Sequence, residues 1–240
     1  MSWTEDARPE SGLVERCFEL SADNGPIPGV YWAPKGAKPT ALVLLGHGGT
    51  RHKKVDYILG VAQQLAAKGI ASFAIDGPGH GDRAKAAFTA TNFAQLWNEG
   101  GGHEGMLADW HAALDFIETE QSALPTGWWG LSMGTMMGLP VCVEEPRIKV
   151  AVLGLMGAWG PNAEELKEAA PKLTIPTRFL TQWDDEVVPR DACLELFDSL
   201  GSKRKTLHAN PGAHAAVPQF EIAASVGFLA QNLAKLGDGV

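Results

Sequence analysis

The chain has 240 residues, of which 45% are hydrophobic and 20% charged, a length and composition typical of a globular domain with a sizeable core. Its 28 acidic and 20 basic residues give a formal net charge of −8, which argues against nucleic acid and anionic membranes as partners. The polar, acidic start, the lack of an apolar run of membrane-spanning length and three widely spaced cysteines predict a cytoplasmic protein without a secretory signal.

In chain order, a loosely ordered segment over residues 1–12 is expected to precede a hairpin, and strands then alternate with helices. Apolar or alternating runs predict strands at 13–21, 27–33, 40–45, 70–75, 127–129, 148–155, 177–181 and 205–209. Helical spacing and end signals predict helices at 54–68, 106–120, 163–169, 190–200 and 219–236, with a further helix after Gly134. The segment 82–105 breaks the pattern, and we expect a loop with a short helix there, near the site.

This alternation predicts an α/β fold with a mostly parallel sheet of about eight strands flanked by helices, because parallel strands need crossover connections. We expect one domain over residues 1–240, since no linker, repeat or low-complexity tract interrupts the chain. Ligands of such sheets bind outside the carboxyl ends of the strands. The candidate residues below all follow predicted strands, so we expect them at one edge of the sheet.

The pentapeptide 130–134, Gly-Leu-Ser-Met-Gly, lies between a predicted strand and a predicted helix. In that context a Gly-x-Ser-x-Gly turn presents the serine hydroxyl at the top of the sheet, and its glycines avoid crowding the neighbouring elements. The turn also places the N–H of Met133 beside the serine oxygen at a helix N-terminus, where negative charge is stabilised. Ser132 is therefore the predicted nucleophile, with an ordinary glycine–serine loop as the alternative.

A serine hydroxyl becomes a nucleophile when a base accepts its proton and a further group orients the base. His214 follows the last predicted strand in a Pro-Gly-Ala-His loop, and we predict it as the base. The loop after strand 177–181 offers three consecutive acids, of which we favour Asp185, shortly before the Val188-Pro189 step, as the orienting carboxylate. Asp184 is left open as a solvated neighbour or a helix-capping acid.

Other residues that follow predicted strands are candidates for binding a cofactor, a metal or the substrate. The Gly-Pro-Gly-His-Gly run at 77–81 lacks the spacing of dinucleotide and P-loop motifs, and no histidine or cysteine pair has metal-ligand spacing, so we predict no cofactor and no metal. His80 is expected to shape the pocket wall and contact the substrate. Met156, Trp159 and Trp183 are expected to line an apolar acyl or alcohol pocket, with core or rim packing as the alternative.

Five motifs follow one another along the chain: Gly-His-Gly-Gly at 46–49, Asp-Gly-Pro-Gly-His-Gly at 76–81, the serine turn at 130–134, Asp185 before Val188-Pro189, and Pro-Gly-Ala-His at 211–214. With these motifs the chain, from about Leu13 onward, resembles the α/β-hydrolase superfamily, whose triad order is also serine, aspartate, histidine. The small size and minimal lid make it similar to small serine esterases and dienelactone-hydrolase-like proteins, although dienelactone hydrolase has a cysteine where this chain has Ser132.

The resemblance implies a further site residue and an activity. It places a second oxyanion donor, the N–H of Gly49, in the loop after strand 40–45, to act with the N–H of Met133, and it gives His47 a structural hydrogen-bonding role. It implies hydrolysis of small-molecule carboxylic esters with small or medium acyl groups through an acyl-enzyme intermediate. A lactonase, thioesterase or acyltransferase with the same triad and a slow-turnover ligand receptor on this fold are the alternatives, and the oligomeric state is left open.

Overall fold

The computed structural model describes residues 2–5, 12–22, 25–84, 89, 92–160 and 162–237. The turn expected around residues 23–24 and most of the N-terminal segment expected to be loosely ordered lie outside these ranges. The chain divides into two compact units, Met1–Leu124 and Pro125–Val240.

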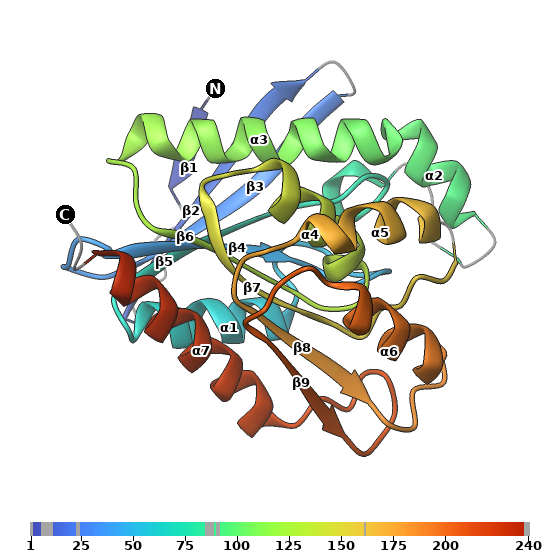
Figure 1. Ribbon diagram of the computed structural model, residues 1–240. Coiled ribbons are helices and arrows are strands. Elements are labelled where there is room, and N and C mark those ends of the chain that lie inside the picture. Colours follow the sequence, from blue (N-terminus) through green and yellow to red (C-terminus); the bar gives the residue numbers. More distant parts are fainter. Residues whose placement is uncertain are drawn as a thin grey trace. The chain divides into compact units, whose positions relative to one another are not determined.

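The first unit combines a sheet with helices on its two faces (Figure 1). Its described strands are β1 Ser2–Glu5, β2 Leu13–Ala22, β3 Gly25–Pro34, β4 Ala41–Gly46 and β5 Ile70–Ile75. Its described helices are α1 Asp56–Ala66, the 3-10 turn η2 Gly81–Arg83, α2 Phe93–Glu99 and α3 Gly102–Glu120. The strand order is β1-β2-β3-β5-β4, in which β4 and β5 are parallel and the other pairs antiparallel.

The core of this unit surrounds β4 and β5, which are buried at every position because both faces of the sheet are covered. Helices α1 and α3 lie on opposite faces of the sheet (Figure 1). α1 buries Ile58, Val61 and Leu65, and α3 buries Trp110 and Leu114, at the spacing that places residues on one side of a helix.

The second unit is a parallel sheet with the strand order β6-β7-β8-β9. Its strands are β6 Thr126–Gly130, β7 Ile148–Gly154, β8 Thr177–Gln182 and β9 Lys205–Asn210. Its described helices are α4 Met133–Glu144, α5 Ala163–Ala169, the 3-10 turn η3 Ala170–Lys172, α6 Arg190–Ser199 and α7 Gln219–Gly237. Helices α4 and α7 pack on β6 and β7 from opposite faces (Figure 1). Since all four strands are parallel, the loops after them meet at one edge.

The predicted elements are found, with shifted ends and one addition. The described residues form nine strands against about eight expected, and the additional one is β1, within the N-terminal segment expected to be loosely ordered. α1 begins at Asp56 rather than at residue 54, because the N–H of Lys53 donates to Oδ1 of Asp76 and holds a turn there. α3 begins at Gly102 rather than at residue 106, with Gly101 at φ 94° preceding its first turn.

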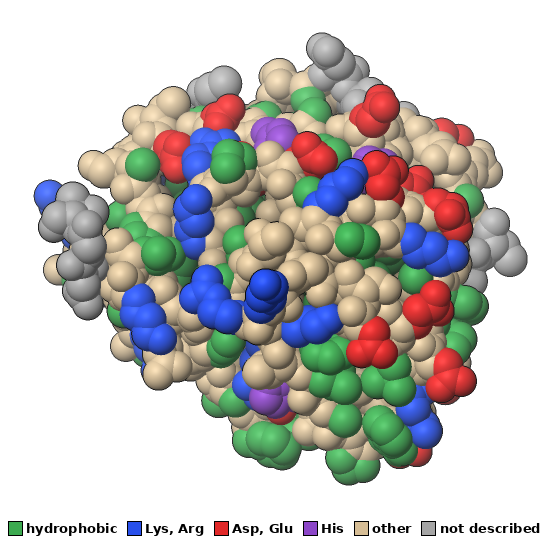
Figure 2. Space-filling view, viewed as in Figure 1, with side chains coloured by type: hydrophobic (Ala, Val, Ile, Leu, Met, Phe, Trp, Pro, Cys, Tyr) green, Lys and Arg blue, Asp and Glu red, His purple; other side chains and the backbone are tan. Residues whose placement is uncertain are grey.

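The surface carries both signs of charge. Figure 2 shows aspartate and glutamate side chains on the visible face together with lysine, arginine and hydrophobic side chains. Within the described ranges, no helix has the length and apolar character needed to cross a membrane. Among the residues that the structure describes, the exposed large hydrophobic side chains are Tyr57, Trp159, Trp183, Val187, Phe220 and Leu236.

Candidate active site

Ser132 lies in a sharp turn between β6 and α4. Its φ of 58° is in the left-handed region, which costs a residue with a side chain on the order of 1–3 kcal/mol, so neighbouring groups must hold it. The N–H of Ser132 donates to the carbonyl of Gly154 at the end of β7 over 2.9 Å. Gly130 permits the turn, because a Cβ there would lie 2.7 Å from the carbonyl oxygen of Gly134. The serine turn thus has the strand–turn–helix context that the sequence predicted.

Three side chains that lie far apart in the sequence meet in the second unit. Nε2 of His214 is 2.9 Å from Oγ of Ser132, and its Nδ1 is 2.7 Å from Oδ2 of Asp185. The other carboxylate oxygen of Asp185 accepts hydrogen bonds from the N–H groups of Val187 and Val188, each over 2.8 Å, and the side chain is only 1% exposed. Asp185 therefore holds the proton of the imidazole on Nδ1, which leaves the lone pair of Nε2 facing the serine hydroxyl.

The two acids beside Asp185 contact the histidine loop through its backbone. Oδ2 of Asp184 accepts a hydrogen bond from the N–H of Gly212 over 3.0 Å, and Oε2 of Glu186 accepts one from the N–H of His214 over 2.9 Å. The N–H of Asp184 also donates to the carbonyl of Gly212. Between the alternatives left open by the sequence, the geometry favours Asp185 as the partner of the imidazole. Asp184 holds the loop instead of capping a helix.

Two backbone N–H groups were expected to face the oxyanion, those of Met133 and Gly49. Met133 is the first residue of α4, and none of the described residues accepts a hydrogen bond from its N–H. Gly49 lies in the first unit, in the loop after β4. Its N–H likewise has no hydrogen-bond acceptor among the described residues. The N–H of the neighbouring Gly48, by contrast, donates to the hydroxyl of Tyr57 over 2.6 Å. The joint role of Met133 and Gly49 stays a prediction.

Three of the residues expected to line the substrate pocket lie in the same unit as Ser132. Trp159 follows β7 and is 48% exposed, Trp183 follows β8 and is 44% exposed, and Met156 is half-buried. The guanidinium of Arg190 lies 4.2 Å from the ring centroid of Trp183, and its Nε donates to the carbonyl of that residue over 3.0 Å, which orients the indole. The two indoles therefore lie at the surface and are not part of the core.

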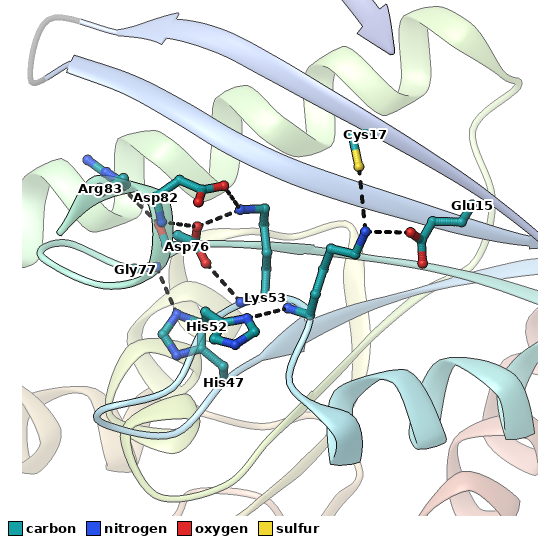
Figure 3. Close-up of polar contacts among 10 residues, drawn as sticks. Glu15, Cys17, His47, His52, Lys53, Asp76, Gly77, Asp82 and Arg83 are labelled. Carbon is teal, nitrogen blue, oxygen red and sulfur yellow. Dashed lines mark hydrogen bonds and ion pairs between the residues drawn. The ribbon is translucent and has the colours of Figure 1, made fainter. Parts of the chain in front are cut away.

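Two histidines of the first unit are buried. Nε2 of His47 accepts a hydrogen bond from the N–H of Gly77 over 2.9 Å (Figure 3), so its proton is on Nδ1, which donates to the carbonyl of Gly48. His80, 2% exposed, contacts the carbonyl of Pro78 through Nδ1 over 2.8 Å, and its ring centroid is 5.3 Å from that of His47. His47 thus has the structural bonding expected of it. His80 fixes its own turn, and its contact with substrate stays a prediction.

We expect the protein to lose stability in mild acid because of His47. Burial lowers the pKa of His47 to about 4, whereas an unfolded histidine titrates near 6.5. As the pH falls below 6.5, the unfolded chain binds a proton that the folded chain does not, so the free energy of unfolding decreases. The loss from this residue is complete near pH 4 and reaches about 3 kcal/mol, since one pKa unit corresponds to about 1.4 kcal/mol.

Urea unfolding at several pH values between 7 and 4 would measure this effect, with His47→Gln as the comparison. Glutamine retains an acceptor for the N–H of Gly77 but does not titrate. The dependence of unfolding free energy on pH should therefore be shallower in the variant. Equal slopes in the two proteins would show that His47 does not contribute.

Figure 3 shows an ionic cluster in the first unit that was not predicted from the sequence. Nζ of Lys53 lies 2.6 Å from Oδ2 of Asp76, which is fully buried, and 2.6 Å from Oδ2 of Asp82. Asp76 also accepts hydrogen bonds from the N–H groups of Lys53 and Asp82. Burial acts to lower the pKa of Lys53, but its ion pairs with the two aspartates outweigh this and raise it.

This cluster ties the loop after β4 to the loop after β5. A buried carboxylate needs partners for its charge, and Asp76 obtains them from a residue 23 positions earlier in the chain. One feature of the sequence pointed to this cluster, namely the position of Asp76 directly after a predicted strand. Nothing in the Arg51-His52-Lys53-Lys54 run distinguishes Lys53 as the residue that turns inward.

Some of the described residues in the segment 82–105 line a cavity within the first unit. The cavity has a volume of about 360 Å³ and is lined in part by Gly79, Arg83 and Leu96. Arg83 is held by an ion pair of 2.5 Å with Asp109 of α3, and both side chains are less than 10% exposed. The expected short helix of this segment is α2, which contributes Leu96 to the lining.

The chain is similar in sequence and fold to several known proteins. A model of the family described as serine aminopeptidase, S33, matches residues 37–160. A cold-adapted esterase from an Arctic intertidal metagenomic library, solved as a PEG-bound complex, is 54% identical, with coverage of 97% of this chain and 100% of that chain and a TM-score of 0.92. A search among curated proteins found no match.

Two more distant structures share the fold. Acetyl xylan esterase from Paenibacillus sp. R4 is 21% identical over 97% of this chain and 88% of that chain, with a TM-score of 0.73. Dienelactone hydrolase from Anabaena variabilis ATCC 29413 is 18% identical over 93% of this chain and 98% of that chain, with a TM-score of 0.68.

The alternating strands and helices, the serine turn and the contacts of His214 define an α/β-hydrolase, as the resemblance implied. The family match spans more than half of the chain, and the esterase relative covers nearly all of it. The chain therefore belongs to the serine aminopeptidase S33 family of α/β-hydrolases.

Proposed function

We propose that this chain hydrolyses carboxylic esters, with Ser132 as nucleophile, His214 as general base and Asp185 as the carboxylate that orients His214. One continuous set of contacts carries the proposal: Oδ2 of Asp185 to Nδ1 of His214 over 2.7 Å, and Nε2 of His214 to Oγ of Ser132 over 2.9 Å. These distances are within hydrogen-bond range, as transfer of the serine proton to the imidazole requires.

The reaction proceeds in two halves. Oγ of Ser132 forms a bond to the ester carbonyl carbon while its proton moves to Nε2 of His214, and the carbonyl oxygen becomes an oxyanion. Collapse of this intermediate breaks the bond to the alcohol oxygen, which takes the proton from His214 and leaves an acyl group on Ser132. Water then attacks the acyl carbon with His214 again as base, and the carboxylic acid is released as Ser132 regains its proton.

The oxyanion needs hydrogen-bond donors, and we assign these to the N–H groups of Met133 and Gly49. The N–H of Met133 lies at the N-terminus of the 12-residue helix α4, whose dipole also favours negative charge. Gly49 belongs to the Gly-His-Gly-Gly run after β4, where the family motif carries the second donor. We assign Trp159, Trp183 and Met156 to the substrate groups on either side of the ester, because the first two expose large apolar surface in the unit that holds the triad.

An esterase activity is supported by the 54% identity to a protein described as an esterase. The family description names a serine aminopeptidase, which makes cleavage of an aminoacyl amide the second candidate. Both reactions would use the same serine and histidine, so the difference lies in the leaving group. The small-molecule substrate, the cytoplasmic location and the lack of nucleic-acid and membrane partners belong to this proposal, and the net charge of −8 supports the last of these.

A labelling and turnover experiment tests the proposal. A fluorophosphonate probe should form an adduct on Ser132, identified by peptide mass spectrometry, in wild-type protein. Short p-nitrophenyl esters should then be hydrolysed faster than thioesters, lactones and aminoacyl p-nitroanilides. Faster cleavage of the anilides would favour the aminopeptidase, and an adduct without turnover of any substrate would favour a ligand receptor.

A further inference from the structure

Thr135 places a buried hydroxyl directly beneath the serine turn. The residue lies in the first turn of α4, three positions after Ser132, and is 0% exposed. Its Oγ1 accepts a hydrogen bond from the N–H of Gly154 over 2.7 Å. The same oxygen lies 2.7 Å from the carbonyl of Gly154 and 2.9 Å from the carbonyl of Gly130, and its single proton is donated to one of these two.

These contacts join three elements that surround the nucleophile. Gly130 ends β6, Gly154 ends β7, and Thr135 belongs to α4. The carbonyl of Gly154 also accepts the hydrogen bond from the N–H of Ser132. The hydroxyl oxygen of Thr135 and the N–H of Ser132 therefore both lie within hydrogen-bond distance of the carbonyl oxygen of Gly154, at the end of β7.

The end of β7 needs such a constraint because its own backbone is unusual. Gly154 has a φ of 142° and Leu155 a φ of 51°, both in the region that residues with side chains rarely adopt. A Cβ at Gly154 would lie 2.1 Å from the carbonyl oxygen of Leu180, so no side chain can help to hold this position. The hydroxyl oxygen of Thr135 accepts a hydrogen bond from the N–H of Gly154 and lies within hydrogen-bond distance of the carbonyl oxygen of the same residue.

We infer that Thr135 is a positioning residue for the reaction. Its hydroxyl holds the backbone of Gly154, which in turn holds Ser132 in its strained conformation with Oγ 2.9 Å from Nε2 of His214. The inference rests on the proposed function of Ser132. A buried hydroxyl that served only the fold would affect stability alone, whereas this one sets the place of the reacting oxygen.

Removing the hydroxyl should reduce the rate of the chemical step. Thr135→Val is expected to lower kcat for p-nitrophenyl acetate and the rate of fluorophosphonate labelling by about 10²-fold, the order expected for a 1 Å misplacement, with KM little changed. Thr135→Ser, which retains the hydroxyl, should restore both rates to within a factor of a few. Rates are compared per folded molecule, at a temperature well below the unfolding midpoint of every variant.

Thr177→Val is the matched control. Thr177 is also 0% exposed and its hydroxyl bonds to a backbone carbonyl, that of Ile175, but it lies at the opposite end of β8 from the triad loops. This variant should lose stability and keep kcat. Equal kcat values for Thr135→Val and Thr177→Val, or a failure of Thr135→Ser to restore the rate, would overturn the inference.

Two further variants guard against a failure of Thr135→Val to fold and test the proposed function separately. Thr135→Ala removes the hydroxyl without pointing a methyl group at the two carbonyls, so it replaces Thr135→Val if that protein does not fold. Ser132→Ala is assayed in parallel. Turnover by Ser132→Ala would reject the proposed function itself, whereas an inactive Ser132→Ala beside a fully active Thr135→Val would reject only the role of Thr135.

Discussion

Replacing Ser132 with alanine should reduce kcat for ester hydrolysis by about 10⁶-fold, the order found when a triad serine is removed. The substitution takes away the atom that forms the acyl-enzyme bond and leaves the imidazole of His214 without a proton to accept. Initial rates with p-nitrophenyl acetate measure the loss, and fluorophosphonate labelling should disappear with it.

Ser225→Ala is the matched control for this prediction. Ser225 is a buried serine of the second unit, whose hydroxyl donates to the carbonyl of Glu221 within α7. Its loss should leave kcat within a factor of a few of wild type. Substantial esterase activity in purified Ser132→Ala, above that of a mock purification, would reject Ser132 as the nucleophile.

Replacing Asp185 with asparagine should lower kcat by about 10⁴-fold while the fold is kept. The amide oxygen of asparagine still accepts hydrogen bonds from the N–H groups of Val187 and Val188. Its NH₂ group, however, donates toward Nδ1 of His214, which moves the imidazole proton to Nε2. The imidazole then no longer presents a lone pair to Ser132 and cannot act as base. Circular dichroism and kcat for the same ester measure structure and activity together.

Asp184→Asn separates the two neighbouring acids. Its oxygen still accepts the hydrogen bond from the N–H of Gly212, and Asp184 makes no contact with the imidazole ring, so kcat should change by no more than a factor of a few. If Asp184→Asn lost most activity and Asp185→Asn little, the orienting carboxylate would be Asp184, in contradiction to the observed geometry.

The regular elements were predictable because they depend on local patterns. The continuous apolar runs of β4 and β5 reflect burial on both faces, and the predicted range of β5 coincides with the observed one, Ile70–Ile75. The helical spacing in α1 likewise reflects packing on one side. Element ends were less predictable, since they depend on partners distant in sequence. α1 begins late because Lys53 is bonded to Asp76 of another loop.

The candidate site likewise contains some residues that the sequence could identify and others that it could not. Ser132 and His214 could be identified because each stands in a short motif directly after a strand, and parallel strands bring such loops to one edge. The residues that hold Ser132 and His214 in place could not be identified from the sequence, since Thr135 and Glu186 belong to no motif. Thr135 occupies an ordinary helical position, and its role depends on β7 ending beside it. Glu186 looks like any exposed acid until the loop of His214 folds against it.

The sequence by itself determined the alternation of strands and helices, the serine turn and the chain order of its partners, because periodicity and turn chemistry act over a few residues. Only the tertiary structure decided which of two adjacent aspartates faces the imidazole and which lysine turns inward to neutralise Asp76. Neighbouring side chains in a loop point in different directions, and the direction of each is set by groups 23 to 82 residues away that come into contact only when the chain folds.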